Sequence, residues 1–340
     1  MHGVLHATAA LGGGITSSLL HFAQTASDYE HFIVSSSRGR FDTGAALESS
    51  FSSVIAVPEG VAEFRAALQR AVRELKPDIV HLHSAVAGLV GRALIAQGNA
   101  AVAYSPHSFY FERTNLRPPV KLAARRLEGL LARRTDLLIA VSPAELRLGE
   151  RLEYQSVFVP NAVAIEADKR VVRPPRLPRR IVAVGRLADQ KDPVFFAQAR
   201  EASGLTGADY EWIWVGAGSA SLERRLERAG VVVTGWRPRS EVVALLADAD
   251  VYGHTAAWEG NPITLLEASA LGVPVVVRSI PSLVSLGYPV DIISPADFGA
   301  AVREALAGNI RPKHPPDMPP RTLSEAYATA LSSRRSEPSQ

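Results

Sequence analysis

The stretch RIVAVGRLADQKDP (residues 180–193) opens with a short run of β-branched and small apolar residues and then turns at Gly185. A run of this kind, bounded by glycine, predicts a strand that is buried on both faces of a parallel sheet. It follows residues 160–180, which are rich in proline and show no helix or strand period, as is typical of a linker. The second domain therefore begins directly after residue 180.

Short apolar strands alternate with amphipathic helical stretches on both sides of this linker. The predicted strands are 3–9, 31–35, 53–57, 78–83, 101–104, 136–141 and 156–159 before the linker, and 180–184, 212–215, 231–234, 251–254, 273–277 and 291–293 after it. Between them, 61–75 has apolar residues at helical spacing. This alternation predicts an α/β protein with two doubly wound domains.

Length and composition agree with this organisation. A chain of 340 residues favours about two domains. We place the first at 1–162, the linker at 163–180, the second at 181–318, and a C-terminal helix with its tail at 319–340. The net charge of +3 argues against a generic nucleic-acid binder. The absence of cysteine excludes disulfides, thiolate metal sites and cysteine nucleophiles.

The N-terminus lacks a basic segment followed by a long apolar core, so we expect no secretory signal. No apolar run approaches the roughly 18 residues that a membrane span requires. These features predict a cytoplasmic enzyme.

Ligands of open α/β sheets bind at the carboxyl ends of the strands, where this chain places many glycines. Gly12–Gly14 precedes a helical stretch and could let a phosphate approach the backbone; a tight strand-to-helix turn is the alternative. It is neither a P-loop nor a dinucleotide fingerprint. Gly216–Gly218 also lacks a third glycine, and the next strand lacks a terminal acidic residue, which disfavours a nicotinamide dehydrogenase.

Two cations, Arg186 and Lys191, lie five residues apart on the loop after residue 185. Arg186 can bind two oxygens at once, and Lys191 adds a mobile point charge. The pair could neutralise a diphosphate leaving group. The alternative is a solvated basic loop.

The stretch EGNPITLLE (residues 259–267) predicts a helix that begins at a strand end. Asn261 is expected as the N-cap and Pro262 as the first helical residue, which leaves the amides of Ile263 and Thr264 to an anion. Carboxylates accept hydrogen bonds from paired hydroxyls, so Glu259 and Glu267 are candidates for a sugar and a ribose. Each glutamate alone could be an ordinary surface residue.

His81 and His83 alternate on one predicted strand, but no third ligand at zinc spacing accompanies them, so a structural role is favoured. His107 follows a strand directly and is the better candidate for contact with substrate. Asp248 and Asp250 precede a strand and are interpreted as a helix-to-strand turn. We expect no required metal.

The segment Glu112–Arg134 holds seven basic and two acidic residues, a local charge of +5. Its apolar residues are expected to form a stripe that faces the core: Val120, Leu122, Ala123, Leu127, Leu130 and Leu131. A basic amphipathic helix can bind an anionic lipid surface. A solvated helix with ordinary core contacts is the alternative.

The order of these motifs resembles that of the family 4 retaining glycosyltransferases. The likeness covers about residues 3–280 and rests on the Gly-rich turn, Asp78–Ser84, Ser105–His107, Val159–Asn161, Val184–Arg186 with Lys191, Val215–Gly218, Thr234–Trp236, and Glu259 with Glu267. The resemblance implies a GT-B fold, with two Rossmann-like domains facing across a cleft and a C-terminal helix crossing back to the first. It also implies metal-independent transfer from a nucleotide sugar, with retention at the anomeric carbon and no required cofactor.

The resemblance assigns roles by matching motifs. Arg186 and Lys191 would hold the diphosphate, Glu259 the donor sugar, and His107 the sugar near the reacting centre. The implied donor-binding residues are Gly13, Gly14, Gly185, Gly216, Gly235, Trp236, Gly260, Asn261, Ile263, Thr264 and Glu267, and the acceptor side is His83 and Ser84. Asn261-Pro262 replaces the family's usual Phe-Gly pair, which leaves the donor sugar open.

The expected function is transfer from a nucleotide-diphosphate sugar, with UDP favoured, to a glycan or lipid-diphosphate-linked sugar in bacterial surface polysaccharide synthesis. Attachment to the inner face of the cell membrane through Glu112–Arg134 would suit such an acceptor. A nucleotide-sugar 2-epimerase of the same architecture and a non-catalytic carbohydrate-binding protein remain as alternatives. The nucleotide, sugar, linkage and oligomeric state stay open.

Overall fold

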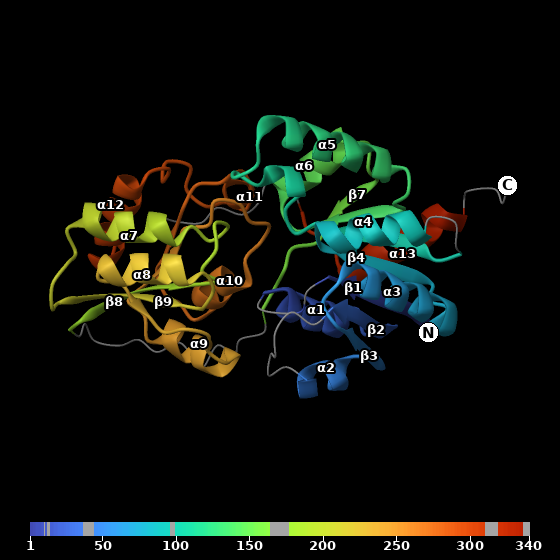
Figure 1. Cartoon of the computed structure of the whole chain (residues 1–340), viewed down its shortest axis with the longest axis horizontal. Helices are drawn as coiled ribbons and strands as arrows, with labels where there is room; N and C mark the ends of the chain where they lie inside the picture. Colours follow the sequence, from blue (N-terminus) through green and yellow to red (C-terminus); the bar gives the residue numbers. More distant parts are fainter. Residues whose placement is uncertain are drawn as a thin grey trace. The chain divides into compact units, whose positions relative to one another are not determined.

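The computed structural model describes residues 1–9, 11, 14–36, 44–95, 99–163, 177–309 and 319–335. The chain divides into two compact units (Figure 1). The first unit comprises Met1–Asn161 with Asp317–Gln340, and the second comprises Ala162–Pro316. Each unit is built around its own parallel sheet.

The first unit has a seven-stranded sheet in the order β3-β2-β1-β4-β5-β6-β7, and each described pairing is parallel. The strands are β1 (His2–Thr8), β2 (Tyr29–Ser36), β3 (Ser53–Val57), β4 (Ile79–His83), β5 (Ala101–Ser105), β6 (Leu137–Ala140) and β7 (Ser156–Phe158). The helices are α1 (Gly14–Thr25), α2 (Gly44–Ser50), α3 (Val61–Leu75), α4 (Ser84–Ile95), α5 (Pro118–Ala132), α6 (Pro143–Arg151) and α13 (Leu323–Arg335), with a 3-10 turn at Tyr110–Glu112.

Alternation along the strands gives this sheet two buried faces. Leu5 and Leu82 face one core together with Phe64 of α3. Val4 and Ile79 face the other, which is covered by α1 and α13 through Phe22 and Tyr327. Helices on both faces bury most of the sheet, which explains why its central strands are largely apolar.

The second unit has a five-stranded parallel sheet in the order β10-β9-β8-β11-β12. Its strands are β8 (Arg179–Val184), β9 (Tyr210–Val215), β10 (Val232–Val233), β11 (Val251–His254) and β12 (Val275–Val277). Its helices are α7 (Pro193–Ser203), α8 (Ala220–Arg228), α9 (Arg239–Ala247), α10 (Ile263–Ala270), α11 (Pro281–Ser285) and α12 (Pro295–Leu306). Phe196, Trp212 and Phe298 lie in the core between this sheet and α7 and α12.

The predicted fold class is confirmed. The strand order reverses between β1 and β4 in the first unit and between β8 and β11 in the second, as in doubly wound sheets. Ligands bind beside such switch points, at the carboxyl ends of the strands.

The strand expected at 291–293 is absent, since the described chain there is irregular. Ser279 holds this segment instead. Its amide donates to the Ile292 carbonyl over 2.7 Å, and its Oγ accepts from the Ile292 amide over 3.0 Å. Because one serine satisfies both backbone groups of Ile292, the segment caps the loop after β12 and does not extend the sheet.

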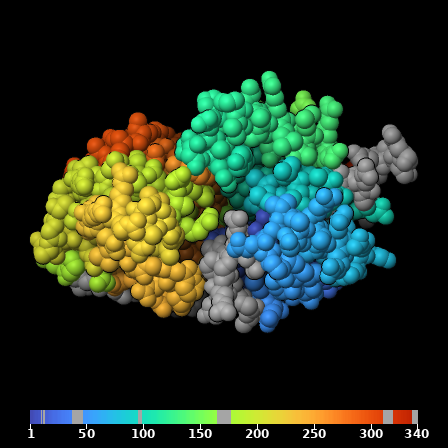
Figure 2. Space-filling view, in the orientation of Figure 1, coloured from blue at the N-terminus to red at the C-terminus, as the bar shows by residue number. Residues whose placement is uncertain are grey.

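The expectation that the apolar stripe of 112–134 faces the core is wrong. Leu122 and Leu130 are 52% and 68% exposed, and Val120, Ala123 and Leu127 are exposed as well. Of that stripe only Leu131 is buried. The segment that contains α5 lies at the surface of the first unit, as the green part of Figure 2 shows.

A buried ion pair explains this orientation of α5. Glu128 faces inward and accepts a hydrogen bond from Nη1 of Arg92 on α4 over 2.9 Å. Arg92 is fully buried and also lies over the ring of Tyr104, 3.9 Å from its centre. Since the face of α5 that carries Glu128 packs inward, the leucines on the other faces are left outside.

Within the described part of the chain, no helix combines the length and the apolar character that crossing a bilayer requires.

Candidate functional site

The loops that follow β8, β9 and β10 meet at the carboxyl edge of the second sheet. Gly216 pairs with Gly235, and Leu187 pairs with Gly218, as isolated bridges beyond the strands. The Gly185 amide also donates to the Val215 carbonyl over 3.0 Å. The structure therefore brings together three of the predicted donor-binding glycines: Gly185, Gly216 and Gly235.

Close backbone approach explains two of these glycines. A Cβ on Gly216 would lie 2.1 Å from the carbonyl oxygen of Gly185. A Cβ on Gly185 would lie 2.8 Å from Cγ of Lys191. Any larger residue would push these loops apart. The stem of Lys191 therefore lies directly against the Gly185 turn.

Lys191 and Glu259, predicted to act on different parts of a substrate, form a direct ion pair. Lys191 Nζ donates to Oε2 of Glu259, and the two side chains are only 21% and 15% exposed. Thr255 Oγ1 donates to the Lys191 carbonyl over 2.9 Å, which ties the two loops together. The result is a partly buried cation and carboxylate at the strand ends, where an anionic, hydroxyl-rich ligand could engage both.

The base of this loop is braced by residues that the sequence reasoning missed. Arg278 donates to Oδ2 of Asp192 over 2.7 Å, and its guanidinium lies 4.3 Å from the centre of the Phe195 ring. Asp192 caps α7 by accepting from the Phe195 amide over 3.1 Å. The Asp192-Pro193 pair is a recognisable helix start, but nothing in the sequence predicted its partner, Arg278.

The helix after Glu259 begins one residue later than expected. Pro262, not Asn261, is the N-cap, and its carbonyl accepts from the amides of Leu265 and Leu266. Asn261 is buried in the loop before it, next to buried Gly260. The prediction of Asn261 as the cap is wrong because Pro262 keeps an extended backbone, with φ −71° and ψ 125°. The helix consequently starts at Ile263, followed by Thr264, whose Oγ1 lies 2.8 Å from the hydroxyl of Tyr252.

The other residues predicted for this unit do not take part in the Lys191–Glu259 ion pair. Glu267 is buried on α10, 2.6 Å from Nη1 of Arg239, and burial raises the pKa of Glu267. Arg186 is exposed, and Trp236 is 47% exposed. Neither residue is in the Lys191–Glu259 pair.

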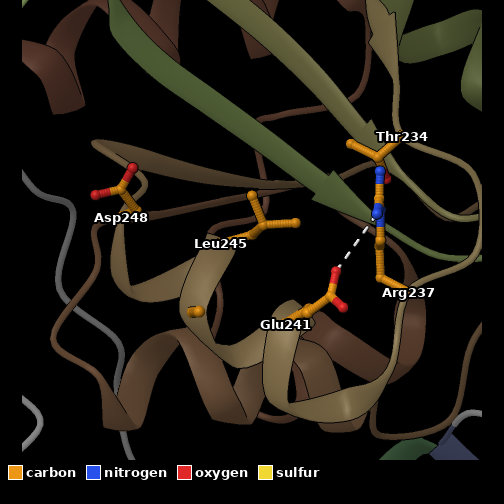
Figure 3. Close-up of a pocket in the computed structure, with 6 residues that line it drawn as sticks. Thr234, Arg237, Glu241, Leu245 and Asp248 are labelled. Carbon is orange, nitrogen blue, oxygen red and sulfur yellow. Dashed lines mark hydrogen bonds and ion pairs between the residues drawn. The ribbon is translucent and has the colours of Figure 1, made fainter.

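A pocket of ≈ 480 Å³ lies between α9 and the turn after β10 (Figure 3). It is lined by Thr234, Arg237, Glu241, Ala244, Leu245 and Asp248. Arg237 and Glu241 form an ion pair along one side of it, 3.4 Å apart. Because Thr234 immediately precedes Gly235 and Trp236, the pocket adjoins the turn that was expected near the nucleotide base.

Asp248 and Asp250 lie in the turn between α9 and β11, at the amino end of the sheet. Asp248 pairs with Arg180, and Asp250 pairs with Arg179 over 2.7 Å. Asp250 also accepts from the Arg180 amide over 2.7 Å. Both carboxylates are therefore engaged in holding the start of β8.

In the first unit, His107 follows β5 in a left-handed backbone conformation, with φ 52°, and Ser108 follows with φ 89°. Glu145 holds this turn by accepting from the amides of Ser108 and Val141, each over 2.7 Å. Burial raises the pKa of Glu145 to about 8. Such strained conformations persist only when the surroundings impose them, and they concentrate at functional sites.

His83 lies at the carboxyl end of β4, and Ser84, with φ 79°, begins α4. His83 Nδ1 is 3.2 Å from Nε2 of His107. Gly14 begins α1. Gly13 lies outside the described residues.

The sequence reasoning missed two histidines, His6 and His31, that join this group. His6 stands opposite His81 in the β1–β4 register, and its ring nitrogens lie 3.0 Å from those of His83 and His31. The signal was available, because β1 and β4 are expected neighbours in a doubly wound sheet. The alternation of strands would then place His6 on the same face as His81 and His83.

His6, His81 and His83 have ring nitrogens within 4.8 Å of one another, the proximity that a metal site requires. Each of their ring nitrogens, however, has a hydrogen-bond partner. His81 bonds the Tyr327 hydroxyl over 2.8 Å and Ser105 Oγ over 2.9 Å. His6 and His83 bond each other and the neighbouring histidines. The donor atoms that a metal would need are thus already used, which favours a polar network.

Comparison with known proteins covers both units. The model "Glycosyltransferase Family 4" matches residues 12–167, and the model "Glycosyl transferases group 1" matches residues 178–307. A UDP-Gal:alpha-D-GlcNAc-diphosphoundecaprenol alpha-1,3-galactosyltransferase of Escherichia coli is 28% identical over 237 residues, which span 63% of this chain and 60% of that relative. An uncharacterised 41.2 kDa protein in the cps region of Klebsiella pneumoniae is 24% identical over 298 residues, 82% of each chain.

The fold has solved counterparts. Anabaena HepE in complex with UDP-glucose superposes with a TM-score of 0.71 at 16% identity, covering 98% of this chain and 94% of HepE. Likeness at this identity concerns the fold alone, which is GT-B. The chain thus carries a Glycosyltransferase Family 4 domain in its first unit and a Glycosyl transferases group 1 domain in its second.

Proposed function

We propose that the chain transfers a sugar from a UDP-sugar to a lipid-diphosphate-linked sugar acceptor during synthesis of a bacterial surface polysaccharide. The Lys191–Glu259 pair carries the proposal, since it places a cation and a hydroxyl-binding carboxylate together at the carboxyl edge of the second sheet. The UDP donor and the lipid-linked acceptor are suggested by the Escherichia coli relative, whose name states both.

In this proposal the second unit holds the donor. Lys191 and exposed Arg186 neutralise the diphosphate as it leaves, and Glu259 accepts hydrogen bonds from sugar hydroxyls. The first amides of α10, at Ile263 and Thr264, add the positive end of a helix. Glu267 accepts from the ribose hydroxyls after exchanging Arg239 for them, and the turn at Gly235 and Trp236 lies beside the base.

We further propose that transfer proceeds with retention and without a metal. The cations and helix amides supply the charge that the departing diphosphate needs. Attack on the same face of the sugar as the leaving group would make a covalent glycosyl-enzyme unnecessary. His107 contacts the donor sugar and Ser84 lies on the acceptor side, whereas His83, predicted beside it, is completely buried with both ring nitrogens hydrogen-bonded and has none left for an acceptor.

The test is acceptor-dependent release of UDP from UDP-galactose and UDP-glucose, with a membrane lipid extract as the source of acceptor. Lys191→Ala and Glu259→Gln should each lower the rate by roughly 100-fold or more while the far-UV circular dichroism stays unchanged. Arg224→Ala and Glu227→Gln on the exposed face of α8 are matched controls and should retain activity. Near-normal turnover in both site variants would refute the proposal. UDP release without acceptor, with appearance of an epimer, would indicate an epimerase.

A second observation favours a membrane surface as the place of action. α5 exposes Val120, Leu122, Leu127 and Leu130 beside arginines of the +5 segment. Exposed apolar side chains flanked by basic ones are typical of helices that lie in the interface of an anionic bilayer. We propose that this face of α5 binds the membrane and brings the site to a lipid-linked acceptor.

Co-sedimentation with vesicles measures this binding directly. The protein should pellet with phosphatidylglycerol vesicles and much less with phosphatidylcholine vesicles. Leu127→Ser with Leu130→Ser should weaken binding at all salt concentrations, whereas Arg125→Gln with Arg126→Gln should weaken it mainly at low salt. Ser substitutions at the exposed Val232 and Val290 of the second unit serve as the control. Equal sedimentation of all variants would count against the proposal.

A further inference from the structure

Four histidines of the first unit form a continuous head-to-tail chain of hydrogen bonds. His107 Nε2 lies 3.2 Å from His83 Nδ1, and His83 Nε2 lies 3.0 Å from His6 Nδ1. His6 Nε2 lies 3.0 Å from His31 Nδ1, and His31 Nε2 lies 2.9 Å from the carbonyl oxygen of Ala26. Every link joins an Nε2 to the next group inward, so the chain has a direction.

The last acceptor sets that direction. A backbone carbonyl can only accept, so His31 Nε2 must carry the proton. A neutral imidazole has one donor and one acceptor, so the Nδ1 of His31 accepts from Nε2 of His6. The same step repeats at His83 and then at His107. Reversing any one ring would set two acceptors or two donors against each other in the interior, which is costly.

The rings are held neutral by their surroundings. His6 and His83 are completely buried, and His31 is 5% exposed. Desolvation is the largest cause that lowers the pKa of each, and the neighbouring histidines lower the pKa of His6 and His83 further. Desolvation also lowers the pKa of His107 to about 4. At neutral pH each of the four histidine rings in this hydrogen-bonded chain is therefore neutral and carries one N–H proton.

We propose that His83, His6 and His31 are positioning residues that lock His107 in the Nε2–H tautomer, so that its Nδ1 is a hydrogen-bond acceptor for a hydroxyl of the donor sugar. The inference rests on the proposed function. Within the described residues no group bonds His107 Nδ1, and the ring is only partly buried at the carboxyl edge of the sheet. Its backbone is fixed by the left-handed turn that Glu145 holds.

The lock has a consequence for recognition. An acceptor-only nitrogen pairs with a hydroxyl, which can donate, and repels a carboxylate or carbonyl oxygen, which cannot. The site therefore selects donor sugars that present a free hydroxyl to His107. It disfavours donors that lack this hydroxyl or carry an oxidised carbon in its place.

Nitrogen-15 NMR of the full chain labelled at histidine tests the lock without any substrate. The long-range spectrum distinguishes a protonated Nε2 from a protonated Nδ1 in each neutral ring. We expect His107, His83, His6 and His31 to show protonated Nε2 and bare Nδ1. A protonated Nδ1 on His107, or an equal mixture of tautomers, would overturn the proposal whether or not the chain is a glycosyltransferase.

Two amide substitutions at His83 separate the lock from simple packing. The oxygen of His83→Asn falls near the place of Nδ1 and keeps an acceptor for His107. The longer side chain of His83→Gln reaches the place of Nε2 and leaves His107 Nε2–H without one. The Asn variant should retain the His107 tautomer. The Gln variant should lose it, with kcat/KM lowered roughly 10- to 100-fold, by analogy with removing the outer partner of a metal-bound histidine.

A remote substitution and a matched control complete the test. His31→Phe keeps an aromatic ring but removes the hydrogen bond to the Ala26 carbonyl. The direction of the hydrogen bonds along the remaining histidines is then no longer fixed, and His107 should become a mixture of tautomers. His81→Gln removes a buried histidine of the same stripe whose nitrogens bond Ser105 and Tyr327 outside the chain, and should leave His107 unchanged. An unchanged His107 tautomer in both His83→Gln and His31→Phe would refute the proposal. Loss of the tautomer in His83→Gln and His31→Phe with unaltered kcat/KM would refute its role in recognition and leave the proposed function intact.

Discussion

At the scale of single residues, the absence of a Cβ at Gly216 allows the loops of the candidate site to approach each other. Its φ of 145° and the 2.1 Å approach of a Cβ to the Gly185 oxygen penalise any side chain. Gly216→Ala should lower the free energy of unfolding by about 3 kcal/mol. Gly204→Ala, also at positive φ but with nothing within 4 Å of its Cβ, should cost only about 1 kcal/mol. Urea unfolding measures both, and equal losses would mean that the close approach does not constrain the loops.

Some residues of the candidate site could be predicted from the sequence, and others could not. Lys191 and Glu259 were recognisable because each follows a predicted strand end, where a doubly wound sheet binds its ligands. Their direct ion pair could not be predicted, because Lys191 and Glu259 are 68 residues apart in sequence and only the fold brings their two loops together. His6 and His31 were missed for a related reason. A histidine on an apolar strand becomes a signal only when it is considered together with the strands expected beside it.

At the scale of elements, the buried pair between Arg92 and Glu128 attaches α5 to α4. Arg92 also donates to the Tyr154 hydroxyl over 2.5 Å and to the Gly88 carbonyl over 2.8 Å. Glu128→Leu would leave an uncompensated buried charge and should destabilise the protein by about 3–5 kcal/mol. The double variant Arg92→Met with Glu128→Leu removes both charges and should recover part of that loss. Chemical unfolding of the native chain and the two variants measures this recovery, and a double variant less stable than Glu128→Leu would show that the pair is not the cause.

The bounds of helices and strands could be predicted where the burial of apolar side chains alone determines them. The strands at Ser53–Val57 and Val251–His254 and the helix at Val61–Leu75 have the predicted bounds, because apolar periodicity follows directly from a sheet or helix packed on a core. Ile292 and Ile293 are apolar, but both backbone groups of Ile292 bond Ser279 outside the sheet. α5 turns its leucines outward because the Arg92–Glu128 pair, not hydrophobicity, orients it. In both cases the structure depends on a partner on another element, Ser279 for residues 291–293 and Arg92 for α5, which the local apolar pattern does not reveal.

At the scale of the whole molecule, two separate cores allow a ligand to act on one unit selectively. A ligand that binds only the folded state adds about 2.7 kcal/mol at a concentration 100 times its Kd. The proposed donor contacts of UDP lie in the second unit, so UDP should slow amide hydrogen exchange most around the Gly185 turn and α10. β7, at the edge of the first sheet farther from the switch point between β1 and β4, should exchange as before.

This selectivity separates a donor site from nonspecific stabilisation. UDP should raise the Tm more than GDP or ADP, and Lys191→Ala should diminish the shift because the diphosphate loses its partly buried cation. Uridine, which lacks the diphosphate, should shift the Tm little in either protein. If UDP protected both sheets equally, or protected the second unit as strongly in Lys191→Ala as in the native chain, the nucleotide would not be held by the loops that join Gly185, Lys191 and Glu259.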